Sequence, residues 1–571
     1  MALAAALAIA FYFETQGGPL QRWAEWDQTD AYYYDFCARR IAGGDVLGRR
    51  IPPPCTAWQT DIAAQCFALR PGLAAVMAAE AAGTGETPAA ALWRRWIGPC
   101  RYHQEPGYVY AVALTYVLCG PRPAAAVVWQ VALGVLCGWL VFALTERYYG
   151  GPAAALAALL CALSAPLLMH QILLLRDGPI CFAGLMLVWL TGRACDQPQP
   201  ARWLLTGLWL GTAMLLKSVF AVYLLGLPLI AALACGGDWR RTARACAALA
   251  AGVALALAPL AARNIACGVP ALALAGNASC TFAQHNSADY RWSDAVPSGT
   301  LLPAILAVSD NATLATIIET FKTHPGLGSV LKMYAGKFDA AWHWWARPDN
   351  ACLYAWQCLS PLLGWMPVTF AVIAPPALVG LFLGARRIRR RLPLYLLVLT
   401  ALAPLLLFCV MERFRLLLFV ACLPFAAGCV TTIIDWLRAG RRGQAAAALG
   451  AVILVACWTA RPLPAGMSKY RSNDFMAAFD LACGAAERDA LYSGKHAAAA
   501  LAFEQFLQCE PPGVRRMAQG LPPGEVSDPS VVEFFSKVHF ECGTYWAKAH
   551  DPRARNQYTR ALLLRQSGPK P

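Results

Sequence analysis

Long runs of apolar residues alternate with polar stretches along this chain. A helix needs roughly 20 mostly apolar residues to cross about 30 Å of hydrocarbon. The first run, Met1 to Phe13, lacks a basic start and a cleavage site, so we interpret it as a retained helix rather than a signal peptide. Ten further spans are predicted at 124–145, 152–170, 179–193, 203–216, 218–234, 245–262, 362–384, 392–411, 416–436 and 446–460. The pattern therefore predicts an all-α membrane protein with about eleven transmembrane helices.

Three polar segments lie outside these spans: 14–107, 263–361 and the tail 461–571. Loops of the length of the first two are usually functional. The boundaries divide the chain into a membrane domain, 1–460, and a soluble helical tail.

The tail contains two groups of small and aromatic residues at tetratricopeptide-like spacing. They are Ala490, Ala499, Phe503, Phe506 and Pro511, and then Tyr545, Ala554, Tyr558 and Ala561. Each group predicts one helix hairpin, and a protein partner that docks on the tail is one hypothesis. The alternative is a set of ordinary amphipathic helices packed on the membrane domain.

Composition supports the membrane assignment. The chain is 58% hydrophobic and 14% charged, with a mean hydropathy of +0.45, whereas soluble chains carry charge at about a quarter of their positions. The net charge of +15 does not indicate a nucleic-acid partner, because the Arg clusters adjoin apolar spans, where cytoplasmic loops collect positive charge.

The Arg clusters also predict the orientation. They are Arg240, Arg241 and Arg244; Arg386, Arg387, Arg389, Arg390 and Arg391; and Arg438, Arg441 and Arg442. All fall on one side if the spans alternate, and this side should be cytoplasmic. The N-terminus is then inside, and the 14–107 loop, the 263–361 loop and the tail are outside. We expect a bacterial cell membrane, with the active site and C-terminus periplasmic.

The 22 cysteines show no C-x-x-C pair. We interpret the cysteines within spans as small residues of the hydrophobic core. Those in the polar segments could form disulfides in an oxidising compartment, with a connectivity that the sequence does not give.

Charged residues at the ends of apolar spans suggest function when they gather on one side, because charge is costly in hydrocarbon. The predicted alternation sends five charged segments to the outer face. They are Asp27, Asp30 and Asp35; Arg176 and Asp177; Lys217; Arg263 with Asn264; and Glu412, Arg413 and Arg415. Basic groups neutralise phosphate oxygens, and a carboxylate accepts a proton from a hydroxyl or holds a divalent ion. This pattern predicts a phosphate-headgroup site with an Asp that activates an acceptor.

Each of these residues also has a structural interpretation. Arg413 and Arg415 could extend to the interface, Lys217 could anchor a helix end, and Arg176 and Asp177 could pair with each other. The functional hypothesis depends on their co-location, and the co-location depends on the topology.

Several short motifs occur in order along the membrane domain. In TDAYYYDFCARRIAGGD, Asp30, Tyr34, Ala38 and Gly43 follow a D-x-x-x-Y-x-x-x-A pattern with a later Gly. The others are EPGYVYAVALTYVLCG, LLLRDGP, GTAMLLKSVF, LAPLAARNIACGVP, CTFAQHN, WHWWARPDN and ERFRLLLF. Together they resemble the motifs of the protein O-mannosyltransferase-like GT-C glycosyltransferases over about residues 1–460. The chain departs from the family pattern where Asp177 replaces Glu, His285 replaces Gly and Arg347 replaces Glu.

The resemblance implies a GT-C helical bundle whose active site lies at the outer membrane face. A polyprenyl-phosphate sugar would bind with its lipid in the bilayer, and the sugar would pass to an acceptor hydroxyl on a glycan, lipid or protein. Asp30 would be the general base or a metal-associated carboxylate, with Asp27 as the alternative and a divalent cation as a possible cofactor. The residues that would bind the donor are Tyr34, Arg176, Asp177, Lys217, Arg263, Asn264, Glu412, Arg413 and Arg415.

Two other classes of protein compete with this interpretation. A transporter or flippase would place charges or broken helices near the bilayer midplane and show internal repeats, whereas these charges lie at span ends. A scaffold would use the tail to recruit partners and carry an inactive membrane part.

Overall fold

The computed structural model describes residues 1–291, 300–464, 467–524 and 528–567. Helices account for 76% of the chain, and the described residues contain no β-strand. Part of the predicted 263–361 loop, 292–299, lies outside the described residues. The predicted all-α fold class is confirmed.

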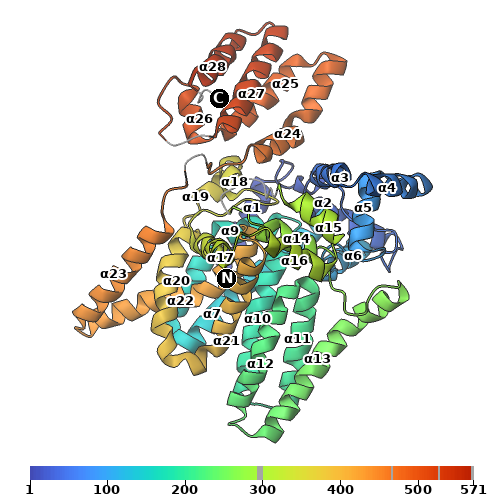
Figure 1. Cartoon of the computed structure of the whole chain (residues 1–571). Helices are drawn as coiled ribbons and strands as arrows, with labels where there is room; N and C mark the ends of the chain where they lie inside the picture. Colours follow the sequence, from blue (N-terminus) through green and yellow to red (C-terminus); the bar gives the residue numbers. More distant parts are fainter. Residues whose placement is uncertain (292–299, 465–466, 525–527, 568–571) are drawn as a thin grey trace.

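A bundle of apolar helices forms the centre of the molecule (Figure 1). Its members are α1 (Ala2–Glu14), α7 (Pro123–Tyr149), α8 (Gly151–Ala162), α10 (Asp177–Asp196), α11 (Pro200–Leu216), α12 (Ala221–Ala234), α13 (Trp239–Ala266), α20 (Phe370–Gly384), α21 (Ile388–Leu407), α22 (Leu416–Arg438) and α23 (Arg442–Thr459). Large apolar side chains on its outside are exposed, such as Leu225 at 80%, Phe382 at 83% and Leu454 at 73%. A water-soluble protein rarely exposes so much apolar surface, so these features indicate an integral membrane protein.

The predicted spans and the helices agree in place but not always in length. Each predicted span contains a helix, but two spans are divided. In 152–170, α8 ends at Ala162, and the Ser164 hydroxyl caps a second, buried helix, α9 (Ala165–Ile172). The region 362–384 holds the end of α19 (Pro361–Trp365) and then α20. Six helical stretches of the described chain are long and apolar enough to cross a membrane by length and composition. The count of eleven therefore stays a prediction.

Close helix contacts in the bundle depend on glycine. A Cβ on Gly207 of α11 would collide with the backbone of Leu249 in α13, and one on Gly252 would collide with Leu204. Gly380 of α20 lies equally close to Phe425 of α22. Small residues let helices approach closely in membranes, where lipid supplies no hydrophobic driving force.

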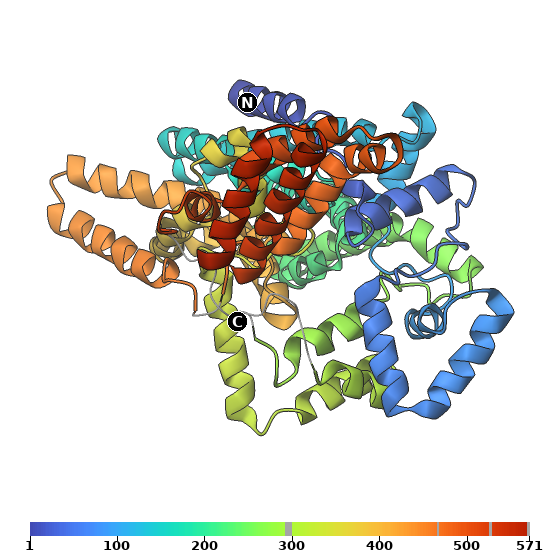
Figure 2. The same ribbon diagram turned by 90° about the horizontal axis from the view of Figure 1, so that it is seen from above.

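Shorter helices cover one end of the bundle. Between α1 and α7 they are α2 (Asp30–Ala42), α3 (Ala57–Leu69), α4 (Pro71–Thr84), α5 (Pro88–Ile97) and α6 (Gly107–Cys119). Between α13 and α20 they are α14 (Ala278–Asn286), α15 (Leu302–Ser309), α16 (Thr313–Lys322), α17 (Leu327–Trp342), α18 (Leu353–Leu359) and α19 (Pro361–Trp365). The helices α3 to α5 lie beside α14 to α16 (Figure 2) and share a core that includes Cys66, Trp93 and Leu306. The helix α6 is apolar but was not among the predicted spans.

The tail forms a helical layer above these short helices (Figure 1). It consists of α24 (Ser472–Ser493), α25 (His496–Phe506), α26 (Pro512–Met517), α27 (Pro529–Lys548) and α28 (Arg553–Ser567). Ala499, Phe503 and Phe506 are buried in its core, as their spacing predicts. The helices pair as α24 with α25 and α27 with α28, while the tetratricopeptide assignment stays a prediction.

The two ends of the bundle differ in charge. The α12–α13 and α20–α21 connections lie at the end opposite the tail and the short helices (Figure 1); Arg240 is in the first turn of α13, and Arg386 lies in the second connection. The two long polar segments and the tail thus share one end of the bundle.

Candidate active site

The carboxylate of Asp30 and the guanidinium of Arg413 form an ion pair, with Oδ2 and Nη2 2.6 Å apart. Asp30 begins α2, where the Thr29 side chain accepts a hydrogen bond from the Tyr32 N–H and fixes the helix start. Arg413 begins a 3-10 helix, Arg413–Arg415, that turns the chain from α21 into α22. The site therefore joins the first polar segment to the connection between two late spans.

Two neighbours hold this pair in place. Arg413 Nε donates to Asp349 Oδ2 at 2.5 Å. Asn350 Oδ1 accepts from the Asp30 N–H at 2.5 Å, and its Nδ2 lies 3.4 Å from Asp30 Oδ2. Burial alone would raise the pKa of Asp30, but the Arg413 guanidinium, a hydrogen bond with Gln104 and the nearby His103 and Arg176 together outweigh burial and hold the pKa of this carboxyl well below its ordinary value. Asp30 is therefore ionised at neutral pH.

A second buried ion pair lies beside the first. Arg176 Nη1 donates to Glu105 Oε2 at 2.5 Å and to the Leu216 carbonyl at 2.9 Å. The second Glu105 oxygen accepts from the Ser218 N–H at 2.7 Å. Burial opposes ionisation of Glu105, but the Arg176 guanidinium and Ser218 lower its pKa to about 2. Arg176 does not pair with Asp177, and its Nε has no hydrogen-bond acceptor among the described residues.

Lys217 lies between α11 and α12, next to the Arg176 pair. Its Nζ is 3.7 Å from the centroid of the Phe414 ring. Burial and the positive charge of Arg176 lower the pKa of Lys217 to about 8. Three cationic side chains therefore converge, and three carboxylates pair directly with two of them: Glu105 with Arg176, and Asp30 and Asp349 with Arg413.

These cations line a groove that is charged at one end and apolar at the other. Its cavity measures about 140 Å³. The charged end is formed by Glu105, Arg176, Asp177, Lys217 and Arg413, and the apolar end by Ile180, Ala401, Pro404, Leu405, Phe408 and Leu417. The apolar residues belong to α10, α21 and α22, except Phe408, which directly follows α21, so the groove runs from the end of the bundle down between its helices. Such a shape suits a ligand with an anionic head and an apolar chain.

A larger cavity of about 800 Å³ opens above the groove. It is lined by Asp27, Asp30, Trp58, Gln104, Asp349, Asn350 and Arg471, among others. Arg176, Arg413 and Phe414 line both cavities. The two spaces therefore meet at the Asp30–Arg413 pair, where a reactant from each could come together.

The structure brings together six of the predicted site residues and separates the others. Asp27, Asp30, Arg176, Asp177, Lys217 and Arg413 line one or both cavities. Tyr34 lies behind the site and donates to Gln104 Oε1 at 2.5 Å.

Four predicted residues have structural partners away from both cavities. Arg263 donates to the carbonyls of the 47–48 turn, and Asn264 donates to carbonyls of residues 270–273. Arg415 donates to the carbonyls of Ala340 and His343. Glu412 Oε2 accepts from the Leu353 N–H at 3.2 Å.

Three residues of the site were not predicted: Glu105, Asp349 and Asn350. Glu105 precedes an apolar helix, α6, and the same span-end criterion would have found it if that helix had been counted. Asp349 and Asn350 occur in the quoted WHWWARPDN motif, but no periodicity distinguishes them from other loop residues.

Among the described residues around Asp30, no cluster of acidic side chains surrounds a place for the predicted divalent cation. The Asp30 carboxylate faces Arg413 and Asn350 rather than a second carboxylate, while divalent ions take several oxygen ligands. In the described part of the chain, no three His, Cys, Asp or Glu side chains gather as a metal site would require. The divalent cation stays a prediction.

Comparisons with known proteins concern the family and the fold. A search of curated proteins found no match. The apo oligosaccharyltransferase of Archaeoglobus fulgidus is 14% identical over 68% of this chain and 49% of that one, with a TM-score of 0.38. The same enzyme in complex with an inhibitory peptide and a dolichol-phosphate is 14% identical over 74% and 50%, with a TM-score of 0.34. The chain thus spans about half the length of these enzymes.

Residues 103–263 match the family described as dolichyl-phosphate-mannose-protein mannosyltransferase. This segment supplies Glu105, Arg176, Asp177 and Lys217 to the groove. This match over part of the chain agrees with the family predicted from the motifs, the GT-C mannosyltransferase-type glycosyltransferases.

Proposed function

We propose that this protein transfers a sugar from a polyprenyl-phosphate carrier to an acceptor hydroxyl on the non-cytoplasmic side of a membrane. The observation that carries the proposal is the groove, which is cationic where it meets the Asp30–Arg413 pair and apolar between α10, α21 and α22. A lipid phosphate combines these two properties. The larger cavity, on the other side of the pair, would take the acceptor.

Arg176, Lys217 and Arg413 would bind the donor phosphate. Arg176 and Arg413 each keep a buried nitrogen that has no acceptor among the described residues, Nε and Nη1 respectively. Such groups are costly to leave unpaired, and phosphate oxygens would satisfy them. Cations held there before the reaction stabilise the charge that develops on the leaving phosphate.

Asp30 would orient and deprotonate the acceptor. The acceptor oxygen forms a bond to the anomeric carbon while the bond from that carbon to the phosphate oxygen breaks. The electron pair leaves with the phosphate, and the hydroxyl proton moves to the Asp30 carboxylate. Attack from the face opposite the phosphate inverts the anomeric carbon. Because its pKa is low, Asp30 is a weak base in the free protein, and it accepts the proton only as the hydroxyl becomes acidic in the transition state.

Reconstituted protein and a labelled polyprenyl-phosphate sugar would test the proposal. Incubation with mixed glycan, lipid and peptide acceptors should yield a labelled product and free polyprenyl phosphate in equal amounts. Movement of intact donor across the vesicle membrane without any product would instead support the transporter hypothesis.

The non-cytoplasmic location has its own test. In a variant whose exposed native cysteines are replaced by serine, a membrane-impermeant thiol reagent should label a cysteine introduced at exposed Asp27 from the outside of sealed cells. Labelling only after the membrane is opened would contradict the proposed orientation.

A further inference from the structure

The segment 348–352 lies between the Asp30–Arg413 pair and the C-terminal tail. On the side of the pair, the Asp349 carboxylate accepts from Arg413 Nε at 2.5 Å, and the Asn350 amide contacts both the N–H and the carboxylate of Asp30. Residues 349 and 350 therefore determine how the pair is oriented.

The tail holds the same segment from the other side. Arg471 Nη1 donates to the Asp349 carbonyl at 2.5 Å, and Asp474 Oδ1 accepts from the Cys352 N–H at 2.8 Å. Arg471 and Asp474 also bridge each other, and Asp474 is fully buried. A buried carboxylate is costly to leave without its hydrogen-bond and ion-pair partners. The contacts of Asp474 therefore fix the segment to the start of α24.

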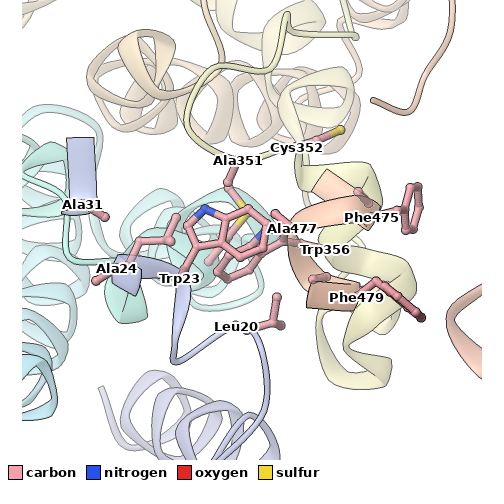
Figure 3. Packing of buried hydrophobic residues seen from close by; sticks show 14 of the residues in the cluster. Leu20, Trp23, Ala24, Ala31, Ala351, Cys352, Trp356, Phe475, Ala477 and Phe479 are labelled. Atoms are coloured by element: carbon pink, nitrogen blue, oxygen red, sulfur yellow. The ribbon is translucent and has the colours of Figure 1, made fainter. Parts of the chain in front are cut away.

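Aromatic packing strengthens this junction. Figure 3 shows the rings of Trp23 and Trp356 below Ala351, with Cys352 and the tail residue Phe475 to their right; all five residues belong to one buried cluster. The rings of Trp23 and Trp356 meet edge to face at 5.2 Å, and Trp23 Nε1 donates to the Asn350 carbonyl at 2.9 Å. The first polar segment, the 348–352 segment and the tail thus share one core.

The tail also reaches the larger cavity. Arg471 and Asn473 both line it, together with Asp30 and Asp349. Arg471 Nη2 is buried and has no hydrogen-bond partner in the described ranges, while its other two nitrogens are held by Asp474 and the Asp349 carbonyl. A donor fixed in this way in a cavity wall is suited to bind an oxygen of a polar ligand.

We propose that the tail is a working part of the active site: Asn473 and Arg471 contact the acceptor, and Arg471 and Asp474 position the 348–352 segment that aligns Asp30 with Arg413. This inference rests on the proposed function, since it names the acceptor side of that site. Asp474 acts only through the segment, because it does not line the cavity, whereas Asn473 lines the cavity without holding the segment.

Kinetics of the full-length protein separate the two roles. Asp474→Asn should lower kcat about 10-fold or more while donor affinity changes less than two-fold, and Asp474→Glu should recover part of the rate. Asn473→Ala should raise the acceptor KM with kcat nearly unchanged. Asp489→Asn is the matched control, because Asp489 lies on the same helix and forms an exposed ion pair with Lys495. This variant should have wild-type kcat and KM. Wild-type kinetics for both Asp474→Asn and Asn473→Ala would overturn the proposal.

Hydrogen exchange gives a readout that needs no turnover. Asp474→Asn should speed exchange in residues 348–353 and also in 28–36, because both depend on the same contacts, while α27 and α28 stay protected. Faster exchange confined to the tail would contradict the positioning role. If wild-type protein transfers no sugar, the proposed function fails, yet this measurement still decides whether the tail holds the segment. Arg471→Lys, which keeps the charge, serves if Asp474→Asn does not fold.

Discussion

Arg413 Nη2 lies 2.6 Å from Asp30 Oδ2, although the two residues come from the first polar segment and from the connection between two late membrane helices. The same guanidinium reaches Asp349 through its Nε and leaves Nη1 without a partner in the described part of the chain. One side chain thus links the proposed base, the segment that aligns it and the groove for the donor phosphate.

We expect Asp30→Asn to abolish transfer, with a loss of about 100- to 10,000-fold, which is the usual contribution of a general base. The amide cannot take the acceptor proton, and it no longer balances the charge of Arg413. Initial rates at saturating donor, with thermal unfolding of the purified protein, would measure this. Asp35→Asn is the matched control, because Asp35 lies on the same helix but pairs with Arg39 and Tyr116. A fully active Asp30→Asn variant would refute the assignment of the base.

Donor binding should weaken as the pH rises through about 8. Lys217 has a pKa of about 8 in the free protein because burial and Arg176 disfavour its charged form. The ammonium is present below this pH and is lost above it, so the donor Kd should increase on the alkaline side. Titration of labelled donor between pH 6.5 and 9.5 would show this.

Lys217→Arg provides the control for this pH dependence. An arginine keeps its charge over the whole range, so its donor Kd should stay nearly constant between pH 7 and 9. An unchanged alkaline loss in Lys217→Arg would show that another group titrates.

The sequence predicted which ends of the spans carry the site, but not which way each side chain points. Alternating membrane crossings place Asp30, Lys217 and Arg413 at one end, as the structure has them. Arg413 and Arg415, however, share one 3-10 turn, and only Arg413 faces the groove. Hydrophobic periodicity gives no direction in such a short connection, because the direction depends on tertiary partners from distant segments.

Breaking the Arg176–Glu105 pair should destabilise the protein. Both side chains are more than 90% buried, so Arg176→Gln leaves Glu105 as an uncompensated buried carboxylate, at a cost of about 3–5 kcal/mol. Because the pKa of Glu105 is lowered to about 2, this stabilisation is present at neutral pH and is lost only as the pH falls toward 2.

A double variant separates stability from binding at this pair. Arg176→Gln with Glu105→Gln removes both charges and should recover part of the lost Tm, but donor affinity should remain low because the phosphate still lacks Arg176. Thermal unfolding in detergent and donor titration would measure the two effects. Recovery of both would mean that Arg176 serves only the fold.

Glu412→Gln should leave transfer intact, although the family motif had made Glu412 a candidate for donor binding. Its carboxylate accepts from the Leu353 N–H away from the groove, and burial raises the pKa of Glu412 to about 8. At neutral pH the carboxyl therefore carries its proton, and a neutral amide can replace it and still accept the hydrogen bond.

The stability of the protein should also depend on pH through Glu412. Since the folded pKa of Glu412 lies above its unfolded value, the wild-type protein loses stability as the pH rises from about 4.5 to 8, and the glutamine variant should lose less. Transfer rates and unfolding curves at pH 5 and pH 8 would check both statements. A loss of transfer comparable to that of Asp30→Asn, with an unchanged Tm, would place Glu412 in the catalytic machinery after all.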